Sequence, residues 1–105
     1  MNFLPEFNVF SSWNILMPIC KRVRYWGRVQ GVGFRVTAQH VASRFDVTGY
    51  VRNLPDGDVE VLIAGEAEDV SRFVEALNVR MAAYIRGHRI DDEPAQEFIG
   101  FEIRT

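Results

Sequence analysis

The residues best suited to chemistry form one short run, residues 27–35, which reads Gly-Arg-Val-Gln-Gly-Val-Gly-Phe-Arg. Glycine permits a positive φ angle and lets a ligand approach the backbone closely. A helix that begins after such a run presents free N–H groups with a partial positive charge, which suit phosphate. Arg35 could hold two phosphate oxygens with its planar guanidinium group. The run therefore predicts an anion site, although a plain tight turn would place glycines in the same way.

This glycine run does not complete two common phosphate-binding motifs. No Gly-Lys-Ser/Thr follows it, as a Walker A loop requires, and Val36 occupies the position of the third glycine in a dinucleotide-binding fingerprint. The run also resembles, faintly, a motif of RNA-recognition domains, which belongs on a third strand with exposed aromatic residues. The expected third strand here is Val-Glu-Val-Leu-Ile-Ala, so RNA binding is set aside.

Hydrophobic periodicity predicts the elements that position this run. Alternating apolar residues predict strands over residues 21–29, 47–53, 59–63, 81–90 and 99–104. Apolar residues at helical spacing predict helices over residues 34–45 and 66–77. A Leu-Pro-Asp-Gly-Asp sequence at residues 54–58 predicts a tight turn, which should join the second and third strands as an antiparallel hairpin.

The order β-α-β-β-α-β, with an extra C-terminal strand, is typical of an α+β, ferredoxin-like sandwich. We expect an antiparallel sheet with two helices on one face. A right-handed first crossover makes the first two strands parallel and leaves room for the third strand between them. Their C-terminal ends then lie at the same edge of the sheet. Topology should therefore bring Asn53, which ends the second strand, close to the glycine run and Arg35.

Composition and charge limit the class of protein. A chain of 105 residues suffices for one domain, and a formal net charge of −2 argues against general nucleic-acid binding. Cys20 is the only cysteine, so no internal disulfide can form, which favours a reducing, cytoplasmic location. No spacing of His, Cys, Asp and Glu indicates a metal site. His40 and His88 have no partner pattern and are expected at the surface or partly buried.

Residues 1–20 differ from the rest because they are apolar and aromatic, with Glu6 as their only charge. They lack the basic start of a secretory signal, and polar residues interrupt them too often for a membrane span. We expect a poorly ordered leader, or an extension upstream of a true start at Met17. The alternative is a segment that packs on the sheet or on a second copy. The domain is expected over residues 21–105, as a monomer, with a dimer through residues 1–20 as the alternative.

Three motifs resemble those of the acylphosphatase family. They are Val-Gln-Gly-Val-Gly-Phe-Arg at residues 29–35, Gly-Tyr-Val-Arg-Asn at residues 49–53 and Asp-Gly-Asp-Val-Glu-Val at residues 56–61. The resemblance covers residues 22–104. It implies a small, metal-free, ferredoxin-like enzyme that hydrolyses carboxyl–phosphate bonds. It also implies an acyl phosphate as the substrate, no cofactor, and a loop that inorganic phosphate or sulfate could occupy. The net charge and the interrupted apolar runs add the expectation of no nucleic-acid or membrane partner.

The resemblance also implies roles for individual residues. Arg35 and Asn53 are the expected catalytic residues, Arg35 on the phosphoryl oxygens and Asn53 on the attacking water. Thr37, one turn into the expected first helix, could support them with a hydrogen bond toward Asn53 or the water, and an ordinary helix hydroxyl is the equal alternative. Arg35 could instead pair with a carboxylate, Asn53 could merely close the strand, and Gln30 could only shape the loop. The backbone N–H groups expected to surround the phosphoryl group are those of Gln30, Gly31, Val32, Gly33, Phe34 and Arg35.

This chemistry asks mainly for positioning and charge stabilisation, because the carboxylate of an acyl phosphate leaves readily. A carboxamide such as that of Asn53 can orient a water molecule but hardly deprotonate it. Two alternatives remain. One is a non-catalytic phosphate- or carbamoyl-phosphate-binding module, similar to the N-terminal part of a larger hydrogenase-maturation carbamoyltransferase. The other is a ferredoxin-like interaction domain. The presence of both Arg35 and Asn53 favours hydrolysis, since a binding module needs only the arginine.

One stretch departs from the family pattern. The family usually has a Gly-Pro sequence after the second helix, whereas residues 78–81 here read Asn-Val-Arg-Met. The resemblance therefore does not predict how the second helix connects to the next strand.

Overall fold

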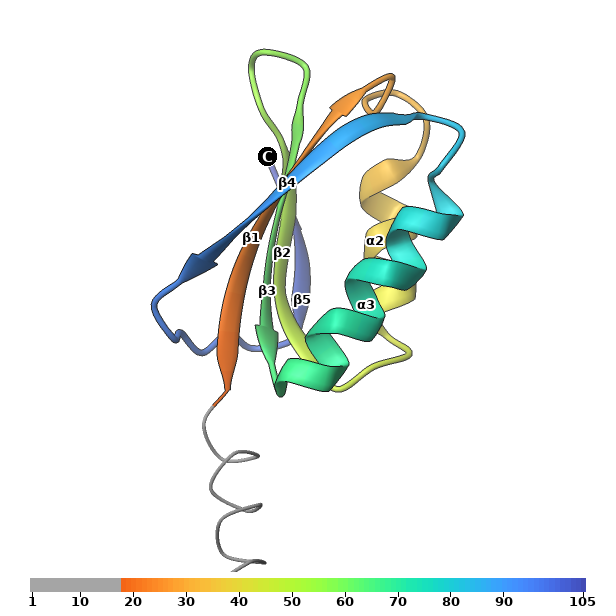
Figure 1. Cartoon of the computed structure of the whole chain (residues 1–105). Helices are drawn as coiled ribbons and strands as arrows, with labels where there is room; N and C mark the ends of the chain where they lie inside the picture. The colour runs from red at the N-terminus through yellow and green to blue at the C-terminus, as the bar shows by residue number, and fades with distance from the viewer. Residues whose placement is uncertain (1–17) are drawn as a thin grey trace, which may run out of the picture.

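A computed structural model describes residues 18–105 of the chain, so the expectations for residues 1–17 lie outside the described residues. Both helices of this part cover the same face of its sheet (Figure 1). The prediction of an α+β, ferredoxin-like sandwich is confirmed. The elements are β1 (Ile19–Gly27), α2 (Phe34–Ala42), β2 (Val47–Asn53), β3 (Val59–Gly65), α3 (Ala67–Arg80), β4 (Ile85–Glu93) and β5 (Phe101–Arg104).

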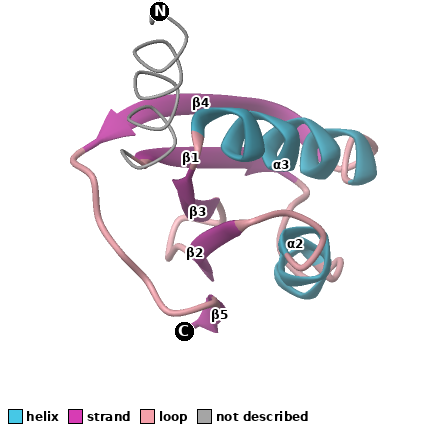
Figure 2. Ribbon diagram, turned by 90° about the horizontal axis from the view of Figure 1, so that it is seen from below, coloured by secondary structure: helices cyan, strands magenta, loops and turns pink. Residues whose placement is uncertain are grey.

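The strand order in the sheet is β4-β1-β3-β2-β5, which can be followed from top to bottom in Figure 2. Strand β3 lies between β1 and β2 and runs antiparallel to both. Strands β1 and β2 are therefore parallel and end at the same edge, as predicted.

Strand β5 corrects one prediction, because it pairs with β2 in parallel and makes the sheet mixed rather than wholly antiparallel. Residues 94–100 connect it to β4 at the end of the sheet where β4 stops (Figure 1). The chain reverses there and enters β5 in the direction of β2.

Several element boundaries also differ from the predicted ones. Strand β1 begins two residues early, because Ile19 and Cys20 pair with Gly65 and Ala64 of β3. These two residues thus belong to the sheet rather than to a leader. Helix α2 ends at residue 42 rather than 45, and β4 spans residues 85–93 rather than 81–90.

The connection after α3, which the sequence left open, follows from a helix longer than predicted. Helix α3 continues to Arg80, and Met81 after it is buried. Asn78, within the extension, accepts a 2.7 Å hydrogen bond from the hydroxyl of Tyr25 on β1. This bond fixes the last turn of α3 to the C-terminal part of β1, and a turn at residues 81–84 then leads into β4.

The core lies between the sheet and the helices and holds the start of α2 in place. The ring of Phe34, the first residue of α2, lies 5.1 Å from the ring of Tyr25, centroid to centroid. Burial of these apolar side chains supplies the main driving force for the fold. The buried helical residues are Phe34, Ala38, Val41 and Ala42 on α2, and Val70, Phe73, Val74 and Leu77 on α3.

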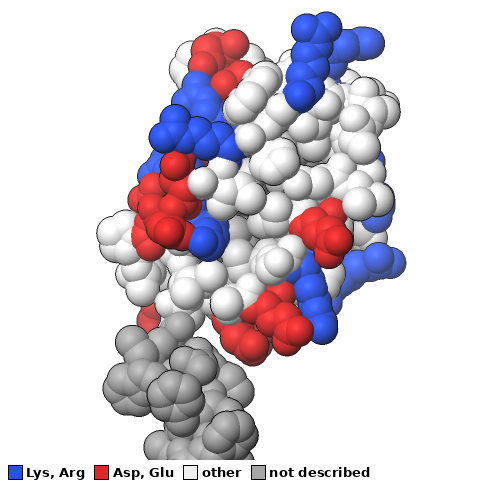
Figure 3. All heavy atoms as spheres, in the orientation of Figure 1, with Lys and Arg blue, Asp and Glu red and all other residues white. Residues whose placement is uncertain are grey.

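The other face of the sheet carries charged side chains, and Figure 3 shows acidic and basic atoms along the side of the molecule where the sheet lies. Glu60 of β3 is only 5% exposed. It accepts hydrogen bonds from Arg22 and, at 2.7 Å, from Nε of Arg52. Burial alone would raise the pKa of Glu60, but its hydrogen bonds and attraction to Arg52 and Arg22 outweigh burial and hold the pKa below its ordinary value.

We expect Glu60→Gln to lower the free energy of unfolding at pH 7 by about 1.5–3 kcal/mol, the scale of hydrogen bonds to charged groups. A lowered pKa in the folded state means that the ionised glutamate stabilises the protein above its ordinary pKa of 4.5 and that this contribution is lost as the pH falls through the folded-state pKa. Urea unfolding measures this effect. The difference in unfolding free energy between the wild type and Glu60→Gln should be smaller at pH 3 than at pH 7.

Glu75→Gln is the matched control for this prediction, because Glu75 is exposed on α3. It should change the unfolding free energy by no more than about 0.5 kcal/mol at either pH. An equal difference between Glu60→Gln and the wild type at both pH values would contradict the role of ionised Glu60.

Candidate active site

Gly31 and Gly33 shape the loop between β1 and α2. Both have a φ of 79°, in the left-handed region. Apart from the adjacent residues in the chain, a Cβ atom at either position would have no described atom within 4 Å. The backbone angle rather than crowding therefore requires glycine here. Because Gly33 immediately precedes α2, this turn sets the direction in which the first N–H groups of the helix point.

The N–H groups of residues 30–36 are available to a ligand. Within residues 18–105, no backbone or side-chain acceptor takes a hydrogen bond from them, and the first bond of the helix runs from Thr37 N–H to Gly33 C=O, at 3.0 Å. No described side chain caps α2, and its first turn contains no acidic residue. The partial positive charge at the start of α2 is therefore uncompensated, which favours an anion.

A small cavity of about 120 Å³ opens at the start of α2. Arg35 reaches it from the first turn of α2, and Asn53 reaches it from the end of β2. The structure thus places Asn53 beside the loop, as the parallel arrangement of β1 and β2 predicted. The residues that line the cavity are Val29, Gly31, Gly33, Phe34, Arg35, Val36 and Asn53.

Arg35 is half-buried, and none of the ion pairs among residues 18–105 involves it. Other arginines of the domain, such as Arg22 and Arg24, pair with two carboxylates each. The alternative interpretation of Arg35 as a surface arginine paired with a carboxylate thus finds no support among the described residues. Arg35 thus lines the cavity as a cation with no described counter-charge.

Three predicted site residues do not line this cavity. The side chain of Gln30 bonds instead to the hairpin between β2 and β3, where its Nε2 donates to the carbonyl oxygens of Leu54 and Asp58. Val32 packs against the hydrophobic core. Thr37 lies half-buried one turn into α2. Gln30 and Val32 can therefore contribute backbone N–H groups, and the structure gives Thr37 no contact with the cavity.

Sequence reasoning did not include two residues of this cavity, Val29 and Val36, among the site residues. Val36 is 65% exposed, yet in the sequence it was considered only as the position of an absent third glycine. An apolar residue next to Arg35 in the first turn of a helix, outside the buried stripe, was the available signal.

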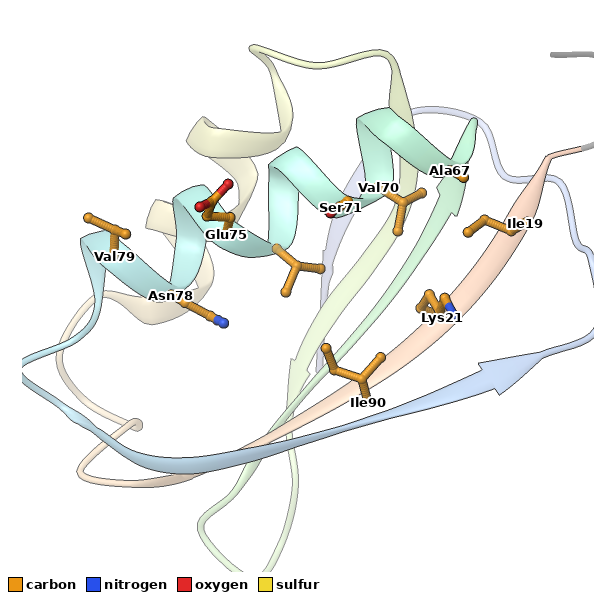
Figure 4. A pocket seen from close by; sticks show the side chains of 10 residues that line it. Ile19, Lys21, Ala67, Val70, Ser71, Glu75, Asn78, Val79 and Ile90 are labelled. Carbon is orange, nitrogen blue, oxygen red and sulfur yellow. The ribbon is translucent and has the colours of Figure 1, made fainter. Parts of the chain in front are cut away.

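A larger hollow of about 540 Å³ lies between α3 and the strands β1 and β4. Figure 4 shows apolar side chains such as Val70 and Ile90 around it, with Lys21 at its wall. Helix α3, which starts there, carries Glu68 and Asp69 in its first turn. These carboxylates compensate the positive end of the helix, so this hollow suits an anion much less than the smaller cavity.

No group of three or more His, Cys, Asp or Glu in residues 18–105 could hold a metal ion. No helix in this part of the chain has the length and apolar character to cross a bilayer. His40 and His88 are both exposed.

Residues 21–103 match the family model described as Acylphosphatase. The chain belongs to the acylphosphatase family. An acylphosphatase of Thermoplasma volcanium is 38% identical to it over 85 residues, which are 80% of this chain and 94% of that protein. The crystal structure of acylphosphatase from Bacillus subtilis superposes with a TM-score of 0.75 at 30% identity, over 83% of this chain and 99% of that chain.

The acylphosphatase fold also occurs within larger proteins. HypF from T. kodakarensis is 30% identical and has a TM-score of 0.72, over 83% of this chain but only 12% of that chain. The present chain therefore corresponds to nearly the whole length of the acylphosphatases named above and to a small part of HypF.

Proposed function

We propose that this chain is an acylphosphatase that hydrolyses the carboxyl–phosphate bond of acyl phosphates, with Arg35 and Asn53 as its catalytic residues. One observation carries the proposal: free backbone amides, an arginine without a described counter-charge and a carboxamide share one cavity of about 120 Å³. Family membership supports the same reaction.

The phosphoryl group binds at the start of α2. The N–H groups of residues 30–35 donate to its oxygens, and Arg35 binds two of them through its forked guanidinium donors. These groups are fixed in place before the substrate arrives, so they stabilise the charge that develops on the phosphoryl oxygens without rearranging. The cavity is small, and the acyl group therefore lies at its opening, beside exposed Val36.

Asn53 orients the attacking water. Its carboxamide offers both an acceptor and a donor, which together fix the orientation of one water molecule. The water oxygen forms a bond to phosphorus, the bond from phosphorus to the acyl oxygen breaks, and the carboxylate leaves with the electron pair. The proton of the water passes to a phosphoryl oxygen, so the protein need not supply a strong base.

A binding module is the second candidate, and the similarity to a small part of HypF favours it. Such a module would use the loop amides and Arg35 to hold phosphate or carbamoyl phosphate without hydrolysis. The position of Asn53 in the same cavity argues for the enzyme, because a binding module has no need of a carboxamide that orients water.

We propose that the enzyme works as a monomer, since the domain holds the loop, Arg35 and Asn53 in a single chain. We also propose a reducing, cytoplasmic location. Cys20 supports it, because this thiol is free and buried in the sheet.

We expect the purified protein to hydrolyse benzoyl phosphate with EDTA present, because amides and a guanidinium group supply the charge stabilisation. Phosphate release measures turnover, and inorganic phosphate should inhibit competitively because it occupies the same loop. Turnover that EDTA abolishes and a divalent metal restores would contradict the metal-free mechanism. Phosphate binding without any turnover would establish the binding module instead.

A further inference from the structure

Gln30 connects the phosphate-binding loop to the hairpin that carries Asn53. Its Nε2 donates one hydrogen bond of 2.9 Å to the carbonyl oxygen of Leu54 and another of 2.8 Å to that of Asp58. Leu54 directly follows Asn53 in the chain. A primary amide has two N–H donors, and Gln30 uses both on the hairpin. Its side-chain nitrogen is therefore not free to bind the substrate.

These two bonds lie beyond the regular part of the sheet. The last residue pair between β1 and β3 is Tyr25 with Val59, and the last pair between β2 and β3 is Asn53 with Val59. Beyond these pairs, two segments face each other: the loop of residues 28–33 and the hairpin turn of residues 54–58. Among the described residues, the two bonds from Gln30 are the hydrogen bonds that join them.

The hairpin turn does not need Gln30 to close. Leu54 N–H donates to the carbonyl of Asp58 at 2.8 Å, and Gly57 N–H donates to the carbonyl of Leu54 at 3.1 Å. Asp56 and Asp58 also pair with Arg24 of β1. The turn thus has its own hydrogen bonds and a second attachment to the sheet. What Gln30 adds is a fixed position of the turn relative to the loop.

We propose that Gln30 is a positioning residue that sets the distance between the loop amides and the carboxamide of Asn53. The proposal rests on the proposed function, in which the loop binds the phosphoryl group and Asn53 orients the water. Phosphate binding depends on the loop and Arg35 alone, whereas the attack depends on the loop and Asn53 together. Loss of the Gln30 bonds should therefore affect kcat more than phosphate affinity.

Gln30→Met tests this separation, because methionine has nearly the same shape and no N–H donor. We expect kcat for benzoyl phosphate to fall by about 10- to 10²-fold, the scale of a misplacement of about 1 Å. The inhibition constant for inorganic phosphate should change less than about threefold, which a general loss of structure would not produce. Unchanged kcat, or a parallel loss of kcat and phosphate affinity, would overturn the proposal.

Gln39→Met is the matched control. Gln39 lies on α2, is exposed, and donates a 3.1 Å bond from Nε2 to the carbonyl oxygen of Phe101, away from the cavity. Gln39→Met removes a bond of the same kind. It should leave both kcat and the inhibition constant for inorganic phosphate unchanged. A fall in kcat as large as that of Gln30→Met would show a nonspecific effect and overturn the proposal.

A double-mutant cycle with Asn53→Ala gives the most direct test. If Gln30 acts through Asn53, Gln30→Met should lower kcat no further once the carboxamide is absent. If the fold-decrease in kcat of the double variant equals the product of the two single decreases, the proposal is overturned.

Turnover of benzoyl phosphate by the wild type distinguishes failure of the proposed function from failure of the positioning role of Gln30. If the wild type shows no turnover of benzoyl phosphate, the proposed function fails. If the wild type turns over and Gln30→Met matches it, the positioning role alone fails.

Discussion

Arg35→Ala should lower kcat/KM for benzoyl phosphate by at least about 10²–10³-fold, the scale for loss of one preorganised donor at a developing charge. Arg35 lines the cavity and its guanidinium group pairs with no described carboxylate, so no ion pair in residues 18–105 offsets its attraction for the phosphoryl oxygens. Its removal should also weaken inhibition by inorganic phosphate. Steady-state kinetics with and without phosphate measure both effects.

Two further variants sharpen this prediction. Arg44→Ala removes an exposed arginine just beyond the other end of α2 and should leave kcat/KM unchanged. Arg35→Lys keeps the charge but loses the fork of two donors, so its activity should fall between those of the wild type and Arg35→Ala. Near-normal activity of Arg35→Ala would exclude a catalytic role for this residue.

Asn53→Ala should lower kcat by about 10²-fold or more, because the attacking water loses its orientation. The loop amides and Arg35 remain, so inorganic phosphate should inhibit the variant as strongly as it inhibits the wild type. A loss confined to kcat indicates an interaction that acts only in the transition state. Parallel measurement of kcat and of phosphate inhibition checks both expectations.

Thr48→Ala, near the opposite end of the same strand, is the control for a general disturbance of β2 and should keep normal activity. Loss of phosphate affinity in Asn53→Ala would make Asn53 a binding residue rather than a group that orients water. A normal kcat in Asn53→Ala would instead support the simpler interpretation, in which Asn53 only closes the strand.

The sequence by itself determined the local geometry of the site. Gly31 and Gly33 take the positive φ angles that glycine favours, and the apolar stripe of α2 fixes which face of the helix is buried. The β-α-β order with a right-handed crossover was enough to bring the ends of β1 and β2 to one edge, and with them Arg35 and Asn53. These features depend on neighbours within a few residues or on a general rule of chain connection.

Only the tertiary structure decided which distant groups meet. Strand β5 could pair in either direction as far as its alternation shows, and the path of residues 94–100 makes it parallel to β2. Gln30 could have faced the substrate, yet the carbonyl oxygens of Leu54 and Asp58 hold its amide. Sequence periodicity specifies which face of an element is buried but not its partner, because the partner depends on contacts between residues far apart in the chain.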